Sequence, residues 1–242
     1  MIDDINNTNN TNNTNNTNRT PKIIEKRLNR NTRLINIEPF DNDNINPIVF
    51  VSDKSDQPPV SVITPYRYGE PFHPMHIQSN DELIIVMGAP SIGYARYIGA
   101  LKAKNDYIIQ TDADAIYPMY YIDAAKKYIN MYNYDFMFTR RLGGFGNKLW
   151  PVIESGIICK KESFIDTAKD ILKTNPYNSW SMTGKRRLDV LDFIMKDEKY
   201  SKATVPLYYR HGLTKTEKFI IGLSATITIS LIASILYKKR RK

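Results

Sequence analysis

Residues 107–118 read Tyr-Ile-Ile-Gln-Thr-Asp-Ala-Asp-Ala-Ile-Tyr-Pro, and the expected architecture of the whole 242-residue chain follows from them. Residues 107–111 form a short, largely apolar run that predicts a β-strand. Asp112 and Asp114 follow it directly, and residues two apart in an extended chain point the same way. Both carboxylates are therefore expected to face one small volume at the carboxyl end of a strand, where open α/β sheets bind ligands.

Two carboxylates placed so close together repel each other unless a cation lies between them. Hard oxygen ligands suit Mg²⁺ or Mn²⁺, which proteins commonly share with substrate phosphates. The sequence therefore predicts a divalent-metal site at Asp112 and Asp114. A solvated acidic turn is the alternative that the Asp-Ala-Asp triplet alone leaves open.

Short β-branched runs alternate with helical spacing on both sides of this stretch. This alternation is typical of an α/β fold in which helices flank a mostly parallel sheet. We predict strands at 60–64, 82–87, 107–111, 135–139 and 204–209, and helices over 91–104, with Ser91 as N-cap, and after Pro118.

Composition excludes several classes of protein. A single cysteine rules out an internal disulfide framework and a cysteine metal cluster. The formal charge of +9 lies on the flanks, because residues 19–33 carry six basic groups against one acid and residues 238–242 are all basic. The body of the chain is nearly neutral and offers no basic stripe, so we expect no nucleic-acid partner.

The two ends differ from the middle of the chain. Asn-Asn-Thr repeats give residues 1–20 almost nothing to bury, so we expect a disordered tail, followed by a basic and polar lead-in at 21–57. Residues 219–237 carry no charge and would form a helix about 28 Å long, which matches a hydrocarbon core. Because five cations follow at 238–242, we expect a transmembrane helix rather than a buried core helix.

This span also bears on assembly and location. Its small residues recur every fourth position and could pack on a second copy of the helix, although chance spacing explains them equally well. The residues are Gly222, Thr226, Ser230 and Ser234. Since the span comes last and no apolar signal precedes the domain, we expect a membrane anchor with the domain on the cytoplasmic side.

An ordered series of motifs surrounds the Asp-Ala-Asp triplet. Pro-Val-Ser-Val-Ile-Thr-Pro-Tyr at 59–66 and Glu-Leu-Ile-Ile-Val at 82–86 precede it, together with Ala95-Arg96 and Gly99, and Pro118 follows it. This series resembles the nucleotide-binding half of GT-A fold glycosyltransferases, most similar to family 2.

The resemblance covers residues 58–135 well and extends loosely to 212. It implies a GT-A, Rossmann-like domain over 58–213, with a nucleotide-sugar half at 58–139 and an acceptor half at 140–213.

The resemblance also implies a site and its cofactors. Because some GT-A enzymes use a late histidine as a metal ligand, it adds His211 as a metal candidate, although an exposed loop histidine is the alternative. The implied cofactors are Mn²⁺ or Mg²⁺ and a UDP- or GDP-sugar. Its donor-side residues are Pro65, Tyr66 and Glu70 beside the nucleoside, Arg96 near the diphosphate, and Asp112 and Asp114 on ribose and metal.

Two departures from the family leave the base of the nucleotide open. Met87-Gly88-Ala89 stands where the family often has an acid that reads the base. Ala115 stands where a third acid frequently follows the pair.

The implied reaction is displacement at an anomeric carbon by a hexosyltransferase. A divalent ion and Arg96 would stabilise the departing diphosphate, and an inverting enzyme needs a carboxylate to accept the acceptor's proton. Our candidates for this base are Asp192, Asp189 and Glu154. The alternative for the two aspartates is an exposed helical acid paired with a neighbouring cation.

Two other functions remain open at this stage. A membrane-anchored protein could keep the nucleotide-sugar fold for binding alone. A phosphatase would use Asp112 as nucleophile, but such a pair normally follows the first strand of its domain rather than the third. For the transferase we expect a glycan, lipid-linked or protein acceptor.

Overall fold

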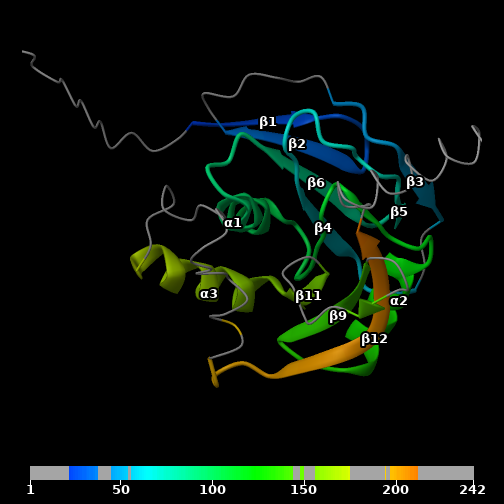
Figure 1. Ribbon diagram of the computed structural model, residues 1–242, viewed down its shortest axis with the longest axis vertical. Helices are drawn as coiled ribbons and strands as arrows, with labels where there is room; N and C mark the ends of the chain where they lie inside the picture. Colours follow the sequence, from blue (N-terminus) through cyan, green and yellow to red (C-terminus); the bar gives the residue numbers. More distant parts are fainter. Residues whose placement is uncertain are drawn as a thin grey trace, which may run out of the picture.

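A computed structural model describes residues 22–37, 45–53, 56–143, 148–149, 156–174, 194 and 197–211 of the chain. Its elements form a layered α/β arrangement around one large sheet (Figure 1). The strands are β1 (Ile23–Arg27), β2 (Thr32–Ile37), β3 (Val49–Ser52), β4 (Val60–Pro65), β5 (Met75–Gln78), β6 (Glu82–Met87), β7 (Tyr107–Gln110), β8 (Ala115–Ile116), β9 (Phe136–Gly143), β10 (Lys148–Leu149), β11 (Ile157–Lys160) and β12 (Lys202–His211). The helices are α1 (Ile92–Lys102), α2 (Tyr121–Met131) and α3 (Lys161–Thr174).

The large sheet has the strand order β1-β2-β6-β4-β7-β11-β9-β12-β8, and β10 pairs with β9. Strands β2, β6, β4, β7, β9 and β12 run in one direction, while β11 runs against both of its neighbours. All six residues of β6 are buried, as expected for a strand covered on both faces of a parallel sheet. The predicted fold class, an α/β fold with helices flanking a mostly parallel sheet, is confirmed.

The predicted strands and helices before and after the acid pair are present with small changes at their ends. Ser91 caps α1, because its side chain accepts a hydrogen bond from the backbone N–H of Tyr94. Helix α2 begins three residues after Pro118, whose carbonyl accepts a hydrogen bond from the Tyr121 N–H. The local signals at 91 and 118 therefore mark helix starts, as the sequence predicts.

Two layers of apolar packing hold the sheet. Helices α1 and α3 cover one face, where their side chains join those of β4, β6 and β9 in one buried cluster (Figure 1). Helix α2 and the separate two-stranded sheet of β3 and β5 contribute to the cluster on the other face. Both clusters pack against the central strands β4, β6 and β7. This packing fixes the carboxyl ends of these strands, where the acid pair lies.

Strand β2 occupies an inner position in the sheet, although the sequence patterns predict no strand before residue 60. It pairs in parallel with β6, and its neighbour β1 pairs with it on the other side. The apolar side chains of Leu34, Ile35 and Ile37 are almost completely buried.

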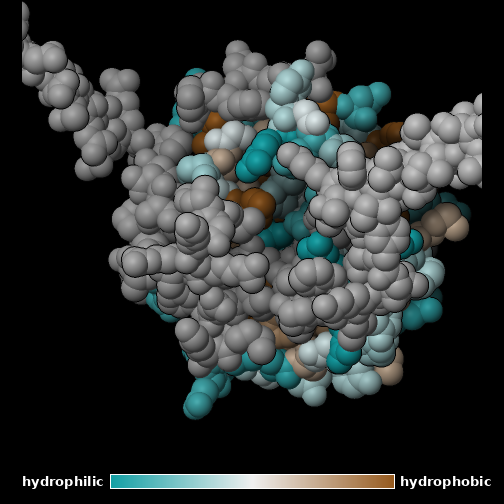
Figure 2. Space-filling model, viewed as in Figure 1, coloured by the Kyte–Doolittle hydropathy of each residue, from teal (hydrophilic) through white to brown (hydrophobic). Residues whose placement is uncertain are grey.

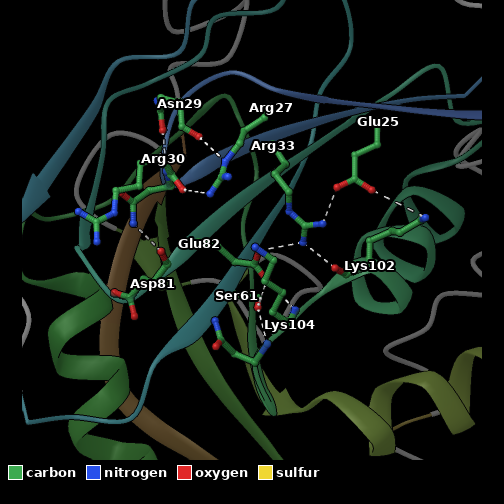
Figure 3. Close-up of polar contacts among 12 residues, drawn as sticks. Glu25, Arg27, Asn29, Arg30, Arg33, Ser61, Asp81, Glu82, Lys102 and Lys104 are labelled. Carbon is green, nitrogen blue, oxygen red and sulfur yellow. Dashed lines mark hydrogen bonds and ion pairs between the residues drawn. The ribbon is translucent and has the colours of Figure 1, made fainter.

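A network of charged groups ties these first strands to the amino end of β4 and β6 (Figure 3). The Arg33 guanidinium lies 2.7 Å from the Glu25 carboxylate and 2.8 Å from that of Glu82. Glu82 in turn accepts hydrogen bonds from the Ser61 hydroxyl at 2.7 Å and the Lys104 backbone N–H at 2.6 Å. Several charges of the lead-in are therefore structural, and this network lies at the opposite end of the parallel strands from the acid pair.

The tail at 1–20, the acceptor-half segment 175–193 and the span 219–237 lie outside the described residues. Within the part of the chain that the structure describes, no helix is long and apolar enough to cross a membrane.

Candidate active site

The acid pair lies at the carboxyl end of β7, in a segment whose side chains alternate strictly between two environments. Ala113, Ala115 and Tyr117 are buried, whereas Asp112 and Asp114 are partly exposed. Residues 113–114 form a turn, in which the Ala115 N–H donates to the Asp112 carbonyl at 3.3 Å, so this stretch is not the extended chain on which the two-residue spacing argument depends.

Helix α1 brings Arg96 to this pair. Its guanidinium lies 2.7 Å from the Asp112 carboxylate, and the Arg96 side chain is only 2% exposed. Because the interior screens charge poorly, this buried guanidinium and the carboxylate attract each other strongly, so the ion pair fixes Arg96 at the end of β7. The structure thus places Arg96 beside Asp112.

The loop after β4 contributes a third carboxylate. This carboxylate is that of Glu70. The backbone of the loop is held to the acid pair by a hydrogen bond from the His73 N–H to the Ala113 carbonyl, at 2.9 Å. Burial raises the pKa of Glu70, and the nearby charges of Asp114 and Asp112 raise it further. Glu70 therefore lies within electrostatic range of both aspartates.

The start of this loop is also fixed. The Tyr66 N–H donates to the Val86 carbonyl at 2.9 Å, and the Tyr66 hydroxyl donates to the Glu70 carbonyl at 3.1 Å. Pro65 is the last residue of β4 and precedes this loop directly. The residues that the resemblance assigns to the nucleoside thus lie on one ordered loop beside the acid pair.

Tyr117 supports the acid pair from the buried side. Its hydroxyl accepts a hydrogen bond from the Asp112 backbone N–H at 2.9 Å. Its ring stacks on that of Tyr209, with centroids 5.1 Å apart, and meets Tyr121 edge-on at 4.7 Å. Burial raises the pKa of Tyr117 well above its ordinary value, so the hydroxyl stays protonated. No motif in the sequence singles out Tyr117, although its place in the alternation after Ala113 and Ala115 is a signal that it points inward.

The chain returns to the site at the end of β12. In the antiparallel pairing of β12 with β8, His211 lies opposite Ala115, and Arg210 lies opposite Ile116. The backbone of His211 is therefore next to the residue that follows Asp114.

Gly156 lies two residues after Glu154 in the sequence and directly precedes β11. Its φ is +89°, and a Cβ at this position would lie 2.2 Å from the Thr139 hydroxyl oxygen, so only glycine fits. Its N–H donates to the Gln110 carbonyl at 2.7 Å. Glu154, Asp189 and Asp192 themselves lie outside the described residues.

The carboxylates of Asp112, Asp114 and Glu70 suit a hard divalent cation in type and charge, because carboxylate oxygens are the ligands such ions prefer. They do not make a complete binding cage. In the described ranges, no group of three or more His, Cys, Asp or Glu side chains lies close enough to hold a metal ion. Such an ion would therefore need further ligands, such as water and the phosphates of a donor.

The molecular surface is hollowed near the centre of the face shown in Figure 2, in the area between α1 and β12 of Figure 1. Both hydrophilic and hydrophobic described residues border this hollow. Such a mixed lining is what a site for a polar ligand with an apolar body needs.

Comparison with known proteins gives a distant likeness to solved structures alone. No protein-family model matches the chain, and no curated protein matches it. The crystal structure of S. aureus TarS 1–349 has 13% sequence identity and a TM-score of 0.42, and the match covers 63% of this chain and 60% of that one.

Two ligand complexes of the same TarS fragment are similar to a comparable extent. The complex with UDP-GlcNAc has 12% identity and a TM-score of 0.42, over 64% of this chain and 59% of that one. The complex with UDP has 14% identity and a TM-score of 0.37, over 60% of each chain. The chain thus matches about three fifths of these structures, and we base the function on the site itself.

Proposed function

We propose that this protein is a metal-dependent glycosyltransferase of the hexosyltransferase type, which transfers a sugar from a nucleotide-diphospho-sugar. The observation that carries the proposal is the buried Arg96 held 2.7 Å from Asp112, with the partly exposed Asp114 two residues further along the chain. This arrangement offers a guanidinium N–H donor group and metal-ligand oxygens at the carboxyl ends of the strands, where α/β sheets bind ligands.

On the donor side, the proposed roles are those that the family resemblance implies. Arg96 would bind the diphosphate, while the loop of Pro65, Tyr66 and Glu70 would border the nucleoside. Asp112 would contact the ribose and, with Asp114 and His211, hold Mn²⁺ or Mg²⁺, which supplies neutralisation of charge on the departing diphosphate. The proposed donor is a UDP- or GDP-sugar.

On the acceptor side, one carboxylate would accept the proton of the attacking hydroxyl. Glu154, Asp189 and Asp192 are the proposed candidates. The position of Gly156 against Gln110 supports Glu154, because it ties the end of that stretch to the strand that carries the acid pair.

Membrane attachment is part of the proposal. Residues 219–237 would form an anchor that keeps the domain on the cytoplasmic side, near a glycan, lipid-linked or protein acceptor, and the small-residue face could pair two copies. Protease treatment of sealed vesicles tests the orientation. Digestion of the domain only after detergent is added would refute a cytoplasmic location.

The proposed reaction is tested with the full chain in detergent, supplied with Mn²⁺ and a panel of UDP- and GDP-sugars. We expect release of nucleoside diphosphate with one donor, and Asp114→Asn should lower that rate more than about 100-fold without changing the melting temperature. Asp106→Asn is the matched control, because Asp106 is an exposed aspartate just before the amino end of the same strand.

Other results would replace the proposal. No turnover with any donor, together with no binding of Mn²⁺, would favour a non-catalytic protein. Release of inorganic phosphate from phosphate esters would favour the phosphatase.

A further inference from the structure

The last part of the sheet exposes a row of side chains on the same side as the acid pair. On β12, Val205, Leu207 and Tyr209 are buried against the α2 face, so the residues between them point to the opposite side. Tyr208 is 38% exposed there, and Arg210 is also exposed.

Strand register extends this row across three strands. Tyr208 lies beside Arg140 of β9, and Arg210 lies between Leu142 of β9 and Ile116 of β8. Arg140 is on the face of β9 that Phe136 and Phe138 share, since residues two apart on a strand point the same way. Asp114 precedes Ile116 by two residues on the exposed side of the chain.

Distances set by the sheet bring the two arginines within reach of one ligand. Neighbouring strands lie about 4.8 Å apart and residues two apart on one strand about 6.6 Å apart, so the Cα atoms of Arg140 and Arg210 are roughly 8 Å apart. Two guanidinium groups at this spacing can hold one anion between them, and Arg forms paired hydrogen bonds with phosphate oxygens.

Among the described residues, no carboxylate forms an ion pair with Arg140 or Arg210. Among the described residues, Arg33, Arg67 and Arg96 each lie beside a carboxylate. Within the same ranges, no ion pair and no side-chain hydrogen bond involves Arg140 or Arg210. The row therefore carries the exposed Arg210 and the partly exposed Arg140, two cations for an anionic ligand, with the Tyr208 ring beside them.

The diphosphate of the donor does not account for this row. The proposed partner of the diphosphate, Arg96, pairs with Asp112, which follows β7. Arg140 lies on β9, and β7 and β9 are two strands apart, which corresponds to about 9 to 10 Å. A molecule that reaches both the acid pair and the arginines would enter from the acceptor side.

We propose that Arg140, Tyr208 and Arg210 form an acceptor subsite, and that the acceptor carries a phosphate near the hydroxyl that receives the sugar. This inference rests on the proposed function, because it names the acceptor class of that reaction. The phosphate belongs either to a soluble phosphodiester or to a lipid headgroup, and both present the same oxygens to the two guanidinium groups.

The test measures phosphate binding by the full chain in detergent, with Mn²⁺, UDP and GDP present at saturating concentrations to occupy the donor side. The probes are a short soluble polyphosphate and nanodiscs containing phosphatidylglycerol, compared with nanodiscs of phosphatidylcholine alone. We expect Arg140→Gln and Arg210→Gln each to weaken binding of the preferred probe about 10-fold, and to reduce its salt dependence. Arg30→Gln, an exposed arginine between β1 and β2, should bind like the natural chain.

The two probes distinguish the source of the phosphate. Arginine-dependent binding of polyphosphate indicates a soluble phosphodiester, and arginine-dependent binding of phosphatidylglycerol alone indicates a lipid headgroup. Equal binding by the Arg140, Arg210 and Arg30 variants, or no binding of either probe, would overturn the subsite.

Donor turnover, measured as nucleoside diphosphate release in the same preparations, separates this inference from the proposed function. Arginine-dependent phosphate binding without donor turnover would leave a phosphate site and refute the transferase. Donor turnover with unchanged binding in both variants would keep the transferase and refute the subsite.

Discussion

Tyr117 controls the acid pair through a single hydroxyl. Tyr117→Phe keeps the ring that stacks on Tyr209 but leaves the Asp112 N–H without the oxygen that accepts its hydrogen bond. We expect a loss of about 1 kcal/mol in the free energy of unfolding, since a net hydrogen bond contributes about that much. We also expect the kcat of the proposed transfer to fall about 10-fold with little change in donor KM, because the Asp112 backbone is less well fixed.

Tyr128→Phe provides the control for this substitution. Tyr128 stacks on Tyr132 of the same region, and its ring is only partly buried. Steady-state kinetics and urea unfolding of both variants check the prediction. Equal kcat values for the two variants would show that the Tyr117 hydroxyl does not position the acid pair.

Glu70 makes stability depend on pH. Burial raises its pKa, and the charges of Asp114 and Asp112 add to this effect, so ionisation is harder in the folded chain than in the unfolded one. The stability that the protonated carboxyl supports is complete below its ordinary pKa, about 4.3, and is lost as pH rises through the raised pKa.

Glu70→Gln removes this titration. Its urea midpoint should equal that of the natural chain near pH 4 when corrected for any constant offset, and should exceed it increasingly as pH rises above about 5. Urea unfolding at a series of pH values measures the difference. A difference that does not change with pH would show that Glu70 ionises as it does in the unfolded chain.

The residues of the site differ in how far the sequence reveals them. The place of Asp112 and Asp114 directly after β7 is predictable, because the apolar run that forms this strand is a local signal. Tyr117 is not, because its role depends on a ring stack with Tyr209, 92 positions later along the chain. The pairing of Arg140 with Tyr208 depends on strand register in the same way, and register is a property of the folded sheet.

At the scale of elements, the close packing of α1 on β4 depends on Gly99. A Cβ at this position would lie 2.4 Å from Cγ2 of Ile63, which no relaxed structure allows. Gly99→Ala should therefore destabilise the fold by about 1 to 3 kcal/mol, the usual cost of overpacking. Because α1 carries Arg96, the same change should also displace the guanidinium and raise the KM for the donor.

A double-mutant cycle with Ile63→Ala isolates this contact. The single change at Ile63 should cost about 2 to 5 kcal/mol, because it opens a cavity in the buried sheet. Adding Gly99→Ala to it should then cost clearly less than it does alone, since the methyl group enters that cavity. Urea unfolding of the four proteins measures the coupling, and strictly additive free energies would contradict the predicted clash.

Strands and helices near the acid pair are predictable because their signals are local. Ser91, Pro118 and the apolar runs of β4, β6 and β7 each mark an element without reference to distant residues. Strand β2 is different, because its buried polar residues Thr32 and Asn36 interrupt the apolar pattern. Its partner β6 lies about 50 positions later, and only that pairing makes residues 32–37 a central strand.

At the scale of the whole molecule, the site is the meeting point of segments from along the described chain. Strand β7 supplies the acid pair, α1 supplies the arginine, the loop after β4 supplies Glu70, and β12 returns to pair beside Asp114. The geometry of the site therefore depends on the whole sheet. Removing a strand at one edge of the sheet should disturb the site as well.

The first strands test this coupling and the domain boundary predicted at residue 58. Deleting residues 1–37 removes β2 and exposes the edge of β6, and burial of Leu34, Ile35 and Ile37 contributes about 1.5 to 3 kcal/mol each. Because a domain is stable by about 5 to 15 kcal/mol in total, we expect this deletion to abolish cooperative unfolding. Deleting residues 1–20 removes only the Asn/Thr-rich tail and should leave the melting temperature unchanged. Circular dichroism during heating measures both, and a cooperative transition after deletion of 1–37 would show that the folded unit begins beyond β2.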